Sequence, residues 1–167
     1  RFQTIEVELY QPKDYSPKGI VTEAKKRISE AKKDKYPFFS IWVVFDKDNH
    51  ANIPHAYDIA ENSNPKIDIA FSNICFEIWI LLHFEKTKKY FKNSYQIIKH
   101  LSEKHNLDYG KTMNIYEAVK DNTTTALTNS AWLLKQNSFD LEKKKPYELD
   151  CYTDFSKLHK HLTDVLK

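Results

Sequence analysis

The chain contains only two glycine residues, Gly19 and Gly110, among its 167 residues. Walker-type phosphate loops and the G-x-G-x-x-G fingerprint need several glycines close together, because the backbone must approach the phosphates. Both motifs are therefore excluded. If the protein acts on phosphate groups, carboxylates and a metal ion would have to carry that chemistry.

Cysteine is also scarce. Cys75 and Cys151 stand far apart, without a C-x-x-C motif or clustered histidines beside them. Neither a zinc site of the cysteine type nor a disulfide framework is indicated. This pattern fits a reducing compartment, and we expect a cytoplasmic protein.

Long hydrophobic runs are absent as well. The longest one, from Cys75 to Phe84, is too short to cross a bilayer and contains Glu77 and His83. No signal peptide is visible at the start of the chain. We therefore expect no membrane partner.

Arginine occurs only at Arg1 and Arg27, so the net charge of +3 comes almost wholly from lysine. Such a mild excess permits a nucleic-acid partner without requiring one. Two lysine-rich stretches could form a phosphate-binding face, although a solvated surface is the more frequent meaning of lysine runs. Their members are Lys86, Lys88, Lys89, Lys92, Lys143, Lys144 and Lys145.

The residues that are present predict an α/β fold in a single domain, residues 1–167. Alternation of Ile5, Val7 and Leu9 with polar residues predicts an edge strand. A helix is expected at 16–33, a central parallel strand covered on both faces at 38–45, a helix from residue 53, and a strand at 67–71. This order predicts a parallel-type sheet flanked by helices over about 1–85. Apolar stripes at helical spacing predict a helical part over about 86–167.

Asp46 and Asp48 follow the apolar strand directly. Side chains alternate along an extended backbone, so both carboxylates can point the same way and bind one hard cation. The alternative is a pair of loop aspartates that caps the next helix. Ligands of open α/β sheets bind beyond the carboxyl ends of the strands, which favours the metal site.

Glu77 lies in a segment, residues 74–84, that is apolar all round and therefore predicts a buried helix capped by Ser72 and Asn73. An unpaired buried carboxylate costs several kcal/mol, so Glu77 needs a partner near the end of the Asp46 strand. A lysine or the amide groups of the helix start would be a structural partner. A metal ion or a metal-bound water would be a functional one.

Two segments carry a resemblance to a known family. The run Val43-Val-Phe-Asp46-Lys-Asp48 and the run Ile69-Ala-Phe-Ser-Asn-Ile-Cys-Phe-Glu77-Ile-Trp-Ile-Leu-Leu-His-Phe84 resemble the RloB-like family. The resemblance covers most of the chain, although Ile74 stands where the family tends to carry proline. It implies a Toprim-like fold and a gene in a restriction or phage-defence cluster.

The resemblance also implies a function. Toprim-like enzymes use a strand-end D-x-D and an upstream glutamate to bind magnesium for phosphodiester chemistry. Asp46 and Asp48 match the D-x-D, and Glu77 would be a further metal or supporting ligand. We therefore expect a nuclease that uses Mg²⁺ or Mn²⁺ on DNA or RNA in bacterial antiphage defence, and ligand type does not separate the two ions.

The upstream glutamate of the family does not occur in this sequence, and by family order it would precede Arg1. The chain is thus expected to fold but to cut nucleic acid poorly until such a segment is restored. The alternative function is a non-catalytic Toprim-like adaptor or regulatory module that binds an ATPase from the same gene cluster or binds nucleic acid. The sequence does not predict an oligomeric state.

Overall fold

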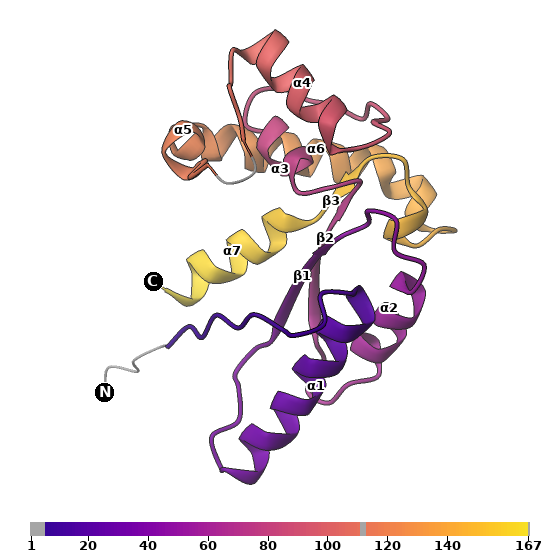
Figure 1. Ribbon diagram of the computed structural model, residues 1–167, viewed down its shortest axis with the longest axis vertical. Helices are drawn as coiled ribbons and strands as arrows, with labels where there is room; N and C mark the ends of the chain where they lie inside the picture. Colours follow the sequence, from indigo (N-terminus) through magenta and orange to yellow (C-terminus); the bar gives the residue numbers. More distant parts are fainter. Residues whose placement is uncertain (1–5, 111–112, 167) are drawn as a thin grey trace. The chain divides into compact units, whose positions relative to one another are not determined.

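A computed structural model describes residues 6–110 and 113–166 and divides the chain into two compact units. The first unit comprises Arg1–Phe45, His50–Ala70 and Lys157–Lys167, and the second comprises Asp46–Asn49 and Phe71–Ser156. Strands β1 (Trp42–Asp46) and β2 (Asp68–Asn73) begin in the first unit and end in the second (Figure 1). The residues that directly follow each strand, 47–49 after β1 and those from Ile74 after β2, therefore belong to the second unit.

The first unit contains the helix pair α1 (Pro17–Lys33) and α2 (Ile53–Glu61), which pack against each other. The Ser16 hydroxyl accepts a hydrogen bond from Gly19 N–H at 3.1 Å, and Pro17 occupies the first turn, as expected of a helix start. Val21 and Ala56 are fully buried. Both predicted helices are thus confirmed.

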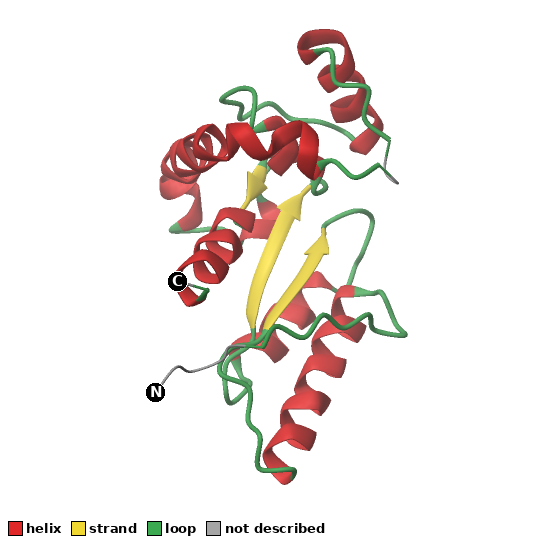
Figure 2. Ribbon diagram, turned by 90° about the vertical axis from the view of Figure 1, so that its left-hand side faces the viewer, coloured by secondary structure: helices red, strands yellow, loops and turns green. Residues whose placement is uncertain are grey.

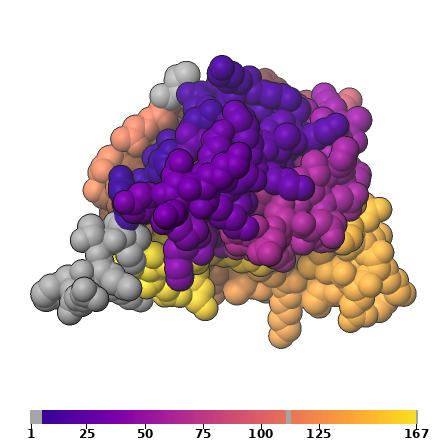
Figure 3. Space-filling model, turned by 90° about the horizontal axis from the view of Figure 1, so that it is seen from below, coloured from indigo at the N-terminus to yellow at the C-terminus, as the bar shows by residue number. Residues whose placement is uncertain are grey.

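The predicted edge strand near the N-terminus is wrong for the described residues 6–10, and Ile5 lies outside them. The Glu8 carboxylate binds Arg27 at 2.6 Å, and the Arg27 guanidinium lies 3.6 Å from the ring centroid of Tyr10. Alternate side chains of this segment therefore contact α1 instead of forming one face of a sheet. Figure 3 shows the surface of this part of the chain in indigo and purple.

The sheet has three strands in the order β1-β2-β3, where β3 is Tyr152–Thr153. β1 and β2 point the same way, and β3 runs antiparallel to β2 (Figure 2). The parallel-type sheet is therefore only partly correct, because the sheet is mixed. The α/β class itself is confirmed.

The prediction of a central strand at 38–45 is also wrong in detail. β1 starts at Trp42 and lies at the edge of the sheet, whereas β2 is the middle strand. Val44 is 47% exposed, so β1 is not covered on both faces. The apolar run was a reliable sign of a strand but not of its position in the sheet.

The second unit contains α3 (Glu77–Leu81), α4 (Ser94–His105), α5 (Tyr116–Val119) and α6 (Thr123–Leu141). Two short 3₁₀ turns, Lys120–Asn122 and Pro146–Glu148, lie among them, and α7 (Phe155–Val165) begins in this unit. The core of this unit gathers apolar side chains from α3, α4 and α6. Helices occur where the stripes predicted them, but the tail also contains β3.

The predicted helix at 74–84 is shorter in the structure. A tighter turn lies at each end of α3. In the turn at its start, Trp79 N–H donates to Phe76 C=O, and in the turn at its end, Phe84 N–H donates to Leu81 C=O. Ser72 and Asn73 do not cap this helix. The Asn73 side chain donates to the Leu149 carbonyl, and the Ser72 hydroxyl lies 2.9 Å from that of Thr153, so both residues bind the β3 side of the sheet.

Helix α6 buries polar residues as well as apolar ones. Asn129 Nδ2 donates to Leu82 C=O at 2.8 Å, and Asn137 Nδ2 donates to Cys151 C=O at 2.9 Å. Both asparagines are buried, and each satisfies a backbone carbonyl of a neighbouring segment. Hydrogen bonds thus fix α6 against α3 and against the approach to β3.

Candidate functional site

Asp46 is the last residue of β1 and is half-buried. The turn that follows is attached to the end of β2, because Lys47 N–H donates to Ser72 C=O at 2.9 Å and Asp48 N–H donates to Ile74 C=O at 3.3 Å. These bonds hold the D-x-D turn beside the segment that leads into α3. All of these residues belong to the second unit.

Asp48 is exposed and has a φ of 37°, in the left-handed region. The extended backbone therefore ends at Asp46, and the alternation that predicted a common direction for the two carboxylates does not continue through Asp48. The turn, not the strand, sets the direction of the Asp48 side chain. Binding of one cation by the pair stays a prediction.

Glu77 is the first residue of α3 and is only 3% exposed, so its predicted burial is confirmed. Its carboxylate accepts hydrogen bonds from the Tyr109 hydroxyl and from the Cys75 thiol. A buried carboxylate needs such donors because burial removes its water. Two of its partners are thus neutral groups, one from the turn before α3 and one from the loop after α4.

The charge of Glu77 changes the pKa values of two neighbouring side chains. Burial, the nearby charge of Glu77 and the hydrogen bond to it raise the pKa of Tyr109 to about 12. The pKa of the Cys75 thiol is also raised. Burial is the largest cause, and the hydrogen bond to Glu77 and the charge of Glu77 add to it. Both groups therefore stay protonated at neutral pH and can donate to the carboxylate.

Asp46 acts on the same two groups. Its charge adds to the upward shifts of the pKa values of Tyr109 and Cys75. Both Asp46 and Glu77 therefore lie within coulombic range of Cys75 and Tyr109, although they come from different elements. That Asp46 and Glu77 bind one ion together stays a prediction.

Sequence reasoning missed Tyr109. Helix α4 ends at His105, and the residue that follows, Asn106, has a left-handed φ of 51°. Leu107 N–H then donates back to Leu101 C=O at 3.2 Å. This reversal directs the loop with Tyr109 toward Glu77. Asn106 is a usable sign of the helix end, but nothing local indicates where the loop goes next.

The two lysine-rich stretches meet at the end of α6. Lys88 Nζ and Lys144 Nζ each lie 3.5 Å from the Asp140 carboxylate, and Lys88 also donates to Gln136 C=O at 2.8 Å. The Lys143 ammonium lies 4.9 Å from the centroid of the Phe139 ring. Lysines that are far apart in the sequence are therefore neighbours on one surface of the second unit.

A different set of metal-ligating side chains is closer together. One ligand atom from each of Glu85, His100 and His105 lies within 4.8 Å of the other two. This cluster was found among the described residues, and the predicted carboxylates Asp46, Asp48 and Glu77 are not part of it. Sequence reasoning did not predict it.

Comparison with known families adds one finding. The family model described as RloB-like protein matches residues 2–162, which is nearly the whole chain. The chain belongs to the RloB-like protein family. Both segments on which the sequence resemblance rests lie inside the matched range of this RloB-like chain.

Searches among curated proteins and among solved structures gave no match. Among the described residues, no helix of this RloB-like chain combines the length and the apolar character that a membrane crossing needs.

Proposed function

We propose that this RloB-like chain is a metal-dependent nuclease with a Toprim-like site, which hydrolyses phosphodiester bonds of DNA or RNA in bacterial antiphage defence. The observation that supports this proposal is the attachment of the turn after Asp46 to the segment that leads into Glu77, by backbone hydrogen bonds of 2.9 and 3.3 Å. The charges of Asp46 and Glu77 also act on the same tyrosine and the same cysteine. Carboxylates near one another and near a buried surface are typical of sites that bind a divalent cation.

The donor set fits the cation that the family implies. Asp46, Asp48 and Glu77 would hold Mg²⁺ or Mn²⁺, because both ions prefer carboxylate oxygens. When bound, the ion would supply positive charge beside the scissile phosphate and ease the deprotonation of water. Asp46 is half-buried and Asp48 is exposed on the turn, so the site has an open side toward solvent.

The residues around Glu77 would position it for this role. The Tyr109 hydroxyl and the Cys75 thiol both donate to its carboxylate, which restricts the rotation of the side chain. A metal ligand that is oriented by outer hydrogen bonds binds its ion more tightly than a free one. In this proposal Tyr109 and Cys75 are positioning residues, since they act through Glu77.

The lysines near Asp140 would bind the nucleic-acid backbone. Lys88 and Lys144 share the carboxylate of Asp140. This part of the chain has an excess of positive charge, because three further lysines lie nearby in the sequence: Lys86, Lys143 and Lys145. Lysine binds phosphates as a point charge and does not read bases. Recognition would therefore be independent of sequence, and affinity would fall with salt.

Cleavage assays test the proposal. The protein is incubated with DNA and with RNA in the presence of Mg²⁺, Mn²⁺ or a chelator, and the double variant Asp46→Asn with Asp48→Asn is compared with Asp58→Asn. Asp58 is an exposed aspartate of α2, so this control makes the same chemical change outside the site. With the family's upstream glutamate segment restored, we expect cleavage that needs the metal and is lost in the double variant only. Equal rates in both variants would rule out the proposed site.

One observation favours a second function, an adaptor or regulatory module that binds a partner ATPase or nucleic acid without cutting it. The Glu77 carboxylate already accepts hydrogen bonds from two protein groups, which can account for its burial without a metal. Binding of nucleic acid that is insensitive to chelator, with no cleavage under any metal condition even after the upstream glutamate segment is restored, would favour the adaptor.

A further inference from the structure

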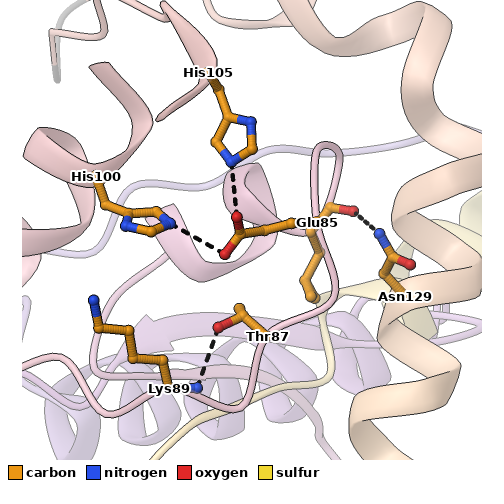
Figure 4. A network of polar contacts seen from close by, with 7 residues as sticks. Glu85, Thr87, Lys89, His100, His105 and Asn129 are labelled. Atoms are coloured by element: carbon orange, nitrogen blue, oxygen red, sulfur yellow. Dashed lines mark hydrogen bonds and ion pairs between the residues drawn. The ribbon is translucent and has the colours of Figure 1, made fainter. Parts of the chain in front are cut away.

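Glu85, His100 and His105 form a compact cluster in the second unit, apart from the residues of the proposed nuclease site. Glu85 follows α3, and both histidines lie on α4. His100 Nε2 is 3.1 Å from Glu85 Oε1, and His105 Nε2 is 2.9 Å from Glu85 Oε2. Figure 4 shows both imidazole rings directed at the one carboxylate.

Aromatic contacts hold both rings in this orientation. The His105 ring stacks on Phe84, with centroids 5.1 Å apart, and the His100 ring meets Phe91 edge to face at 5.7 Å. The side chains of His100, His105 and Glu85 are 16%, 18% and 30% exposed. The cluster is thus partly shielded from water but open enough for an ion to enter.

Hydrogen bonds also fix the segment that carries Glu85. Asn129 of α6 donates to the Leu82 carbonyl at 2.8 Å, and Lys89 N–H donates to the Thr87 hydroxyl at 3.1 Å (Figure 4). These bonds lie on either side of Glu85 along the chain. The three candidate ligands are therefore held in place by the surrounding structure before any ion binds.

We propose that Glu85, His100 and His105 bind a divalent transition-metal ion, with Zn²⁺ as the ion that fits best. Two imidazole nitrogens and one carboxylate form a ligand set that zinc accepts and that hard cations such as Mg²⁺ disfavour. Three protein ligands leave a fourth tetrahedral position for water. The site shares no residue with the carboxylates proposed for the nuclease.

The spacing of the ligand atoms suits an ion of this size. Two ligands that each lie about 2.1 Å from a tetrahedral zinc ion are roughly 3.4 Å apart. The nitrogen–oxygen separations of 2.9 and 3.1 Å, which end on different oxygens of Glu85, would open by a few tenths of an ångström, and the other pairs of ligand atoms, all within 4.8 Å, would close toward this spacing. Side-chain rotation alone supplies such a change.

The same arrangement without an ion is a pair of hydrogen bonds, in which each Nε2–H donates to one oxygen of Glu85. Zinc binding needs the other tautomer of each ring, in which the proton lies on Nδ1 and Nε2 offers its lone pair to the metal. The bound ion would join the segment after α3 to helix α4. It would also raise the free energy of unfolding, by an amount that grows with the logarithm of the zinc affinity.

Calorimetry with zinc chloride tests this proposal on the whole chain after treatment with chelator. We expect one zinc ion per chain, and an affinity that falls by more than roughly a hundredfold in the double variant His100→Gln with His105→Gln, since even changes outside the ligand shell reduce metal affinity 10–100-fold. His55→Gln is the matched control, because His55 is exposed on α2 and outside the cluster. Absence of zinc binding in the wild-type protein, or equal affinity in the double variant, would overturn the proposal.

Two further measurements keep the test decisive if the double variant folds poorly. Glu85→Gln keeps the shape of the side chain and should also weaken zinc binding, at least about tenfold. Cobalt titration of the wild-type protein should give the visible absorption of a four-coordinate ion, and His55→Gln should give the same spectrum. A spectrum of hydrated cobalt alone, or unchanged zinc affinity in Glu85→Gln, would contradict the assigned ligands.

Discussion

Two glutamates of the second unit, Glu77 and Glu85, face different surroundings although α3 and a short turn are all that separates them. Glu77 is 3% exposed and accepts hydrogen bonds from a tyrosine and a cysteine. The Glu85 side chain is 30% exposed and meets two histidines. The difference shows that two nearby carboxylates of one segment can have very different exposure and different hydrogen-bond partners.

Metal preference follows from these neighbours. In the proposed nuclease site Glu77 acts with the aspartates of the D-x-D turn, so the donors are carboxylate oxygens and Mg²⁺ or Mn²⁺ is the expected ion. Near Glu85 the further donors are imidazole nitrogens, which suit zinc. If both proposals hold, the chain binds two kinds of divalent ion at separate places and for separate purposes.

The largest expected effect is a loss of cleavage activity when Glu77 is replaced. Glu77→Gln should reduce metal-dependent cleavage roughly a hundredfold or more, because a lost carboxylate removes several kcal/mol of electrostatic stabilisation around the ion. Its zinc affinity should stay unchanged. Cleavage rates and zinc calorimetry of the same preparation measure both. The control is Glu142→Gln, at an exposed glutamate that follows α6.

A second prediction concerns the donors to Glu77. Tyr109→Phe should lower the free energy of unfolding by about 1.5–3 kcal/mol, because it removes a hydrogen bond to a charged and buried group. Urea denaturation measures the change. Tyr95→Phe is the matched control, since Tyr95 is 69% exposed and should change stability by less than about 0.5 kcal/mol. Equal effects of the two substitutions would refute the proposed importance of the Tyr109 contact.

Loss of a hydrogen-bond donor to Glu85 should reduce stability less than loss of a donor to Glu77. In the presence of chelator, His105→Gln should reduce the free energy of unfolding by only about 0.5–1 kcal/mol, because its partner keeps access to water. With zinc chloride the difference from wild type should grow, since only the wild type gains the binding energy of the ion. A thermal melt with and without zinc checks this, and a constant difference between the two conditions would contradict it.

A smaller, spectroscopic effect should appear at alkaline pH. The pKa of Tyr109 is raised to about 12, so this group binds its proton more tightly in the folded than in the unfolded chain. Its contribution to stability is therefore present below pH ~10 and is lost as the pH rises toward about 12. Subtracting the ultraviolet titration of Tyr109→Phe from that of wild type isolates this residue from the other nine tyrosines. In Glu77→Gln the midpoint should move down, and an unmoved midpoint would mean that the Glu77 charge does not act on Tyr109.

The sequence predicted the elements whose signals are local. The Ser16-Pro17 start identified α1, and the apolar residues of 67–71 identified β2, although that strand continues to Asn73. β3 was missed because two residues, Tyr152 and Thr153, are too few for a period-two pattern. Position within the sheet also escaped prediction, because it depends on which strands pair.

The site was predictable where burial follows from composition and unpredictable where it follows from tertiary contacts. An all-round apolar segment correctly indicated that Glu77 is buried. Tyr109 and the histidine cluster gave no comparable sign. His100 and His105 are five residues apart, and the familiar spacing for two helical ligands on one face is three or four. Their convergence depends on Glu85 approaching from a different segment.

Calorimetry with magnesium or manganese chloride, on wild type and on the double variant Asp46→Asn with Asp48→Asn, tests the central claim most directly. The account predicts one ion bound by the wild type with a loss of affinity in the double variant, while Asp58→Asn behaves as wild type. Unchanged affinity for both ions in the double variant would contradict the assignment of the site to Asp46 and Asp48.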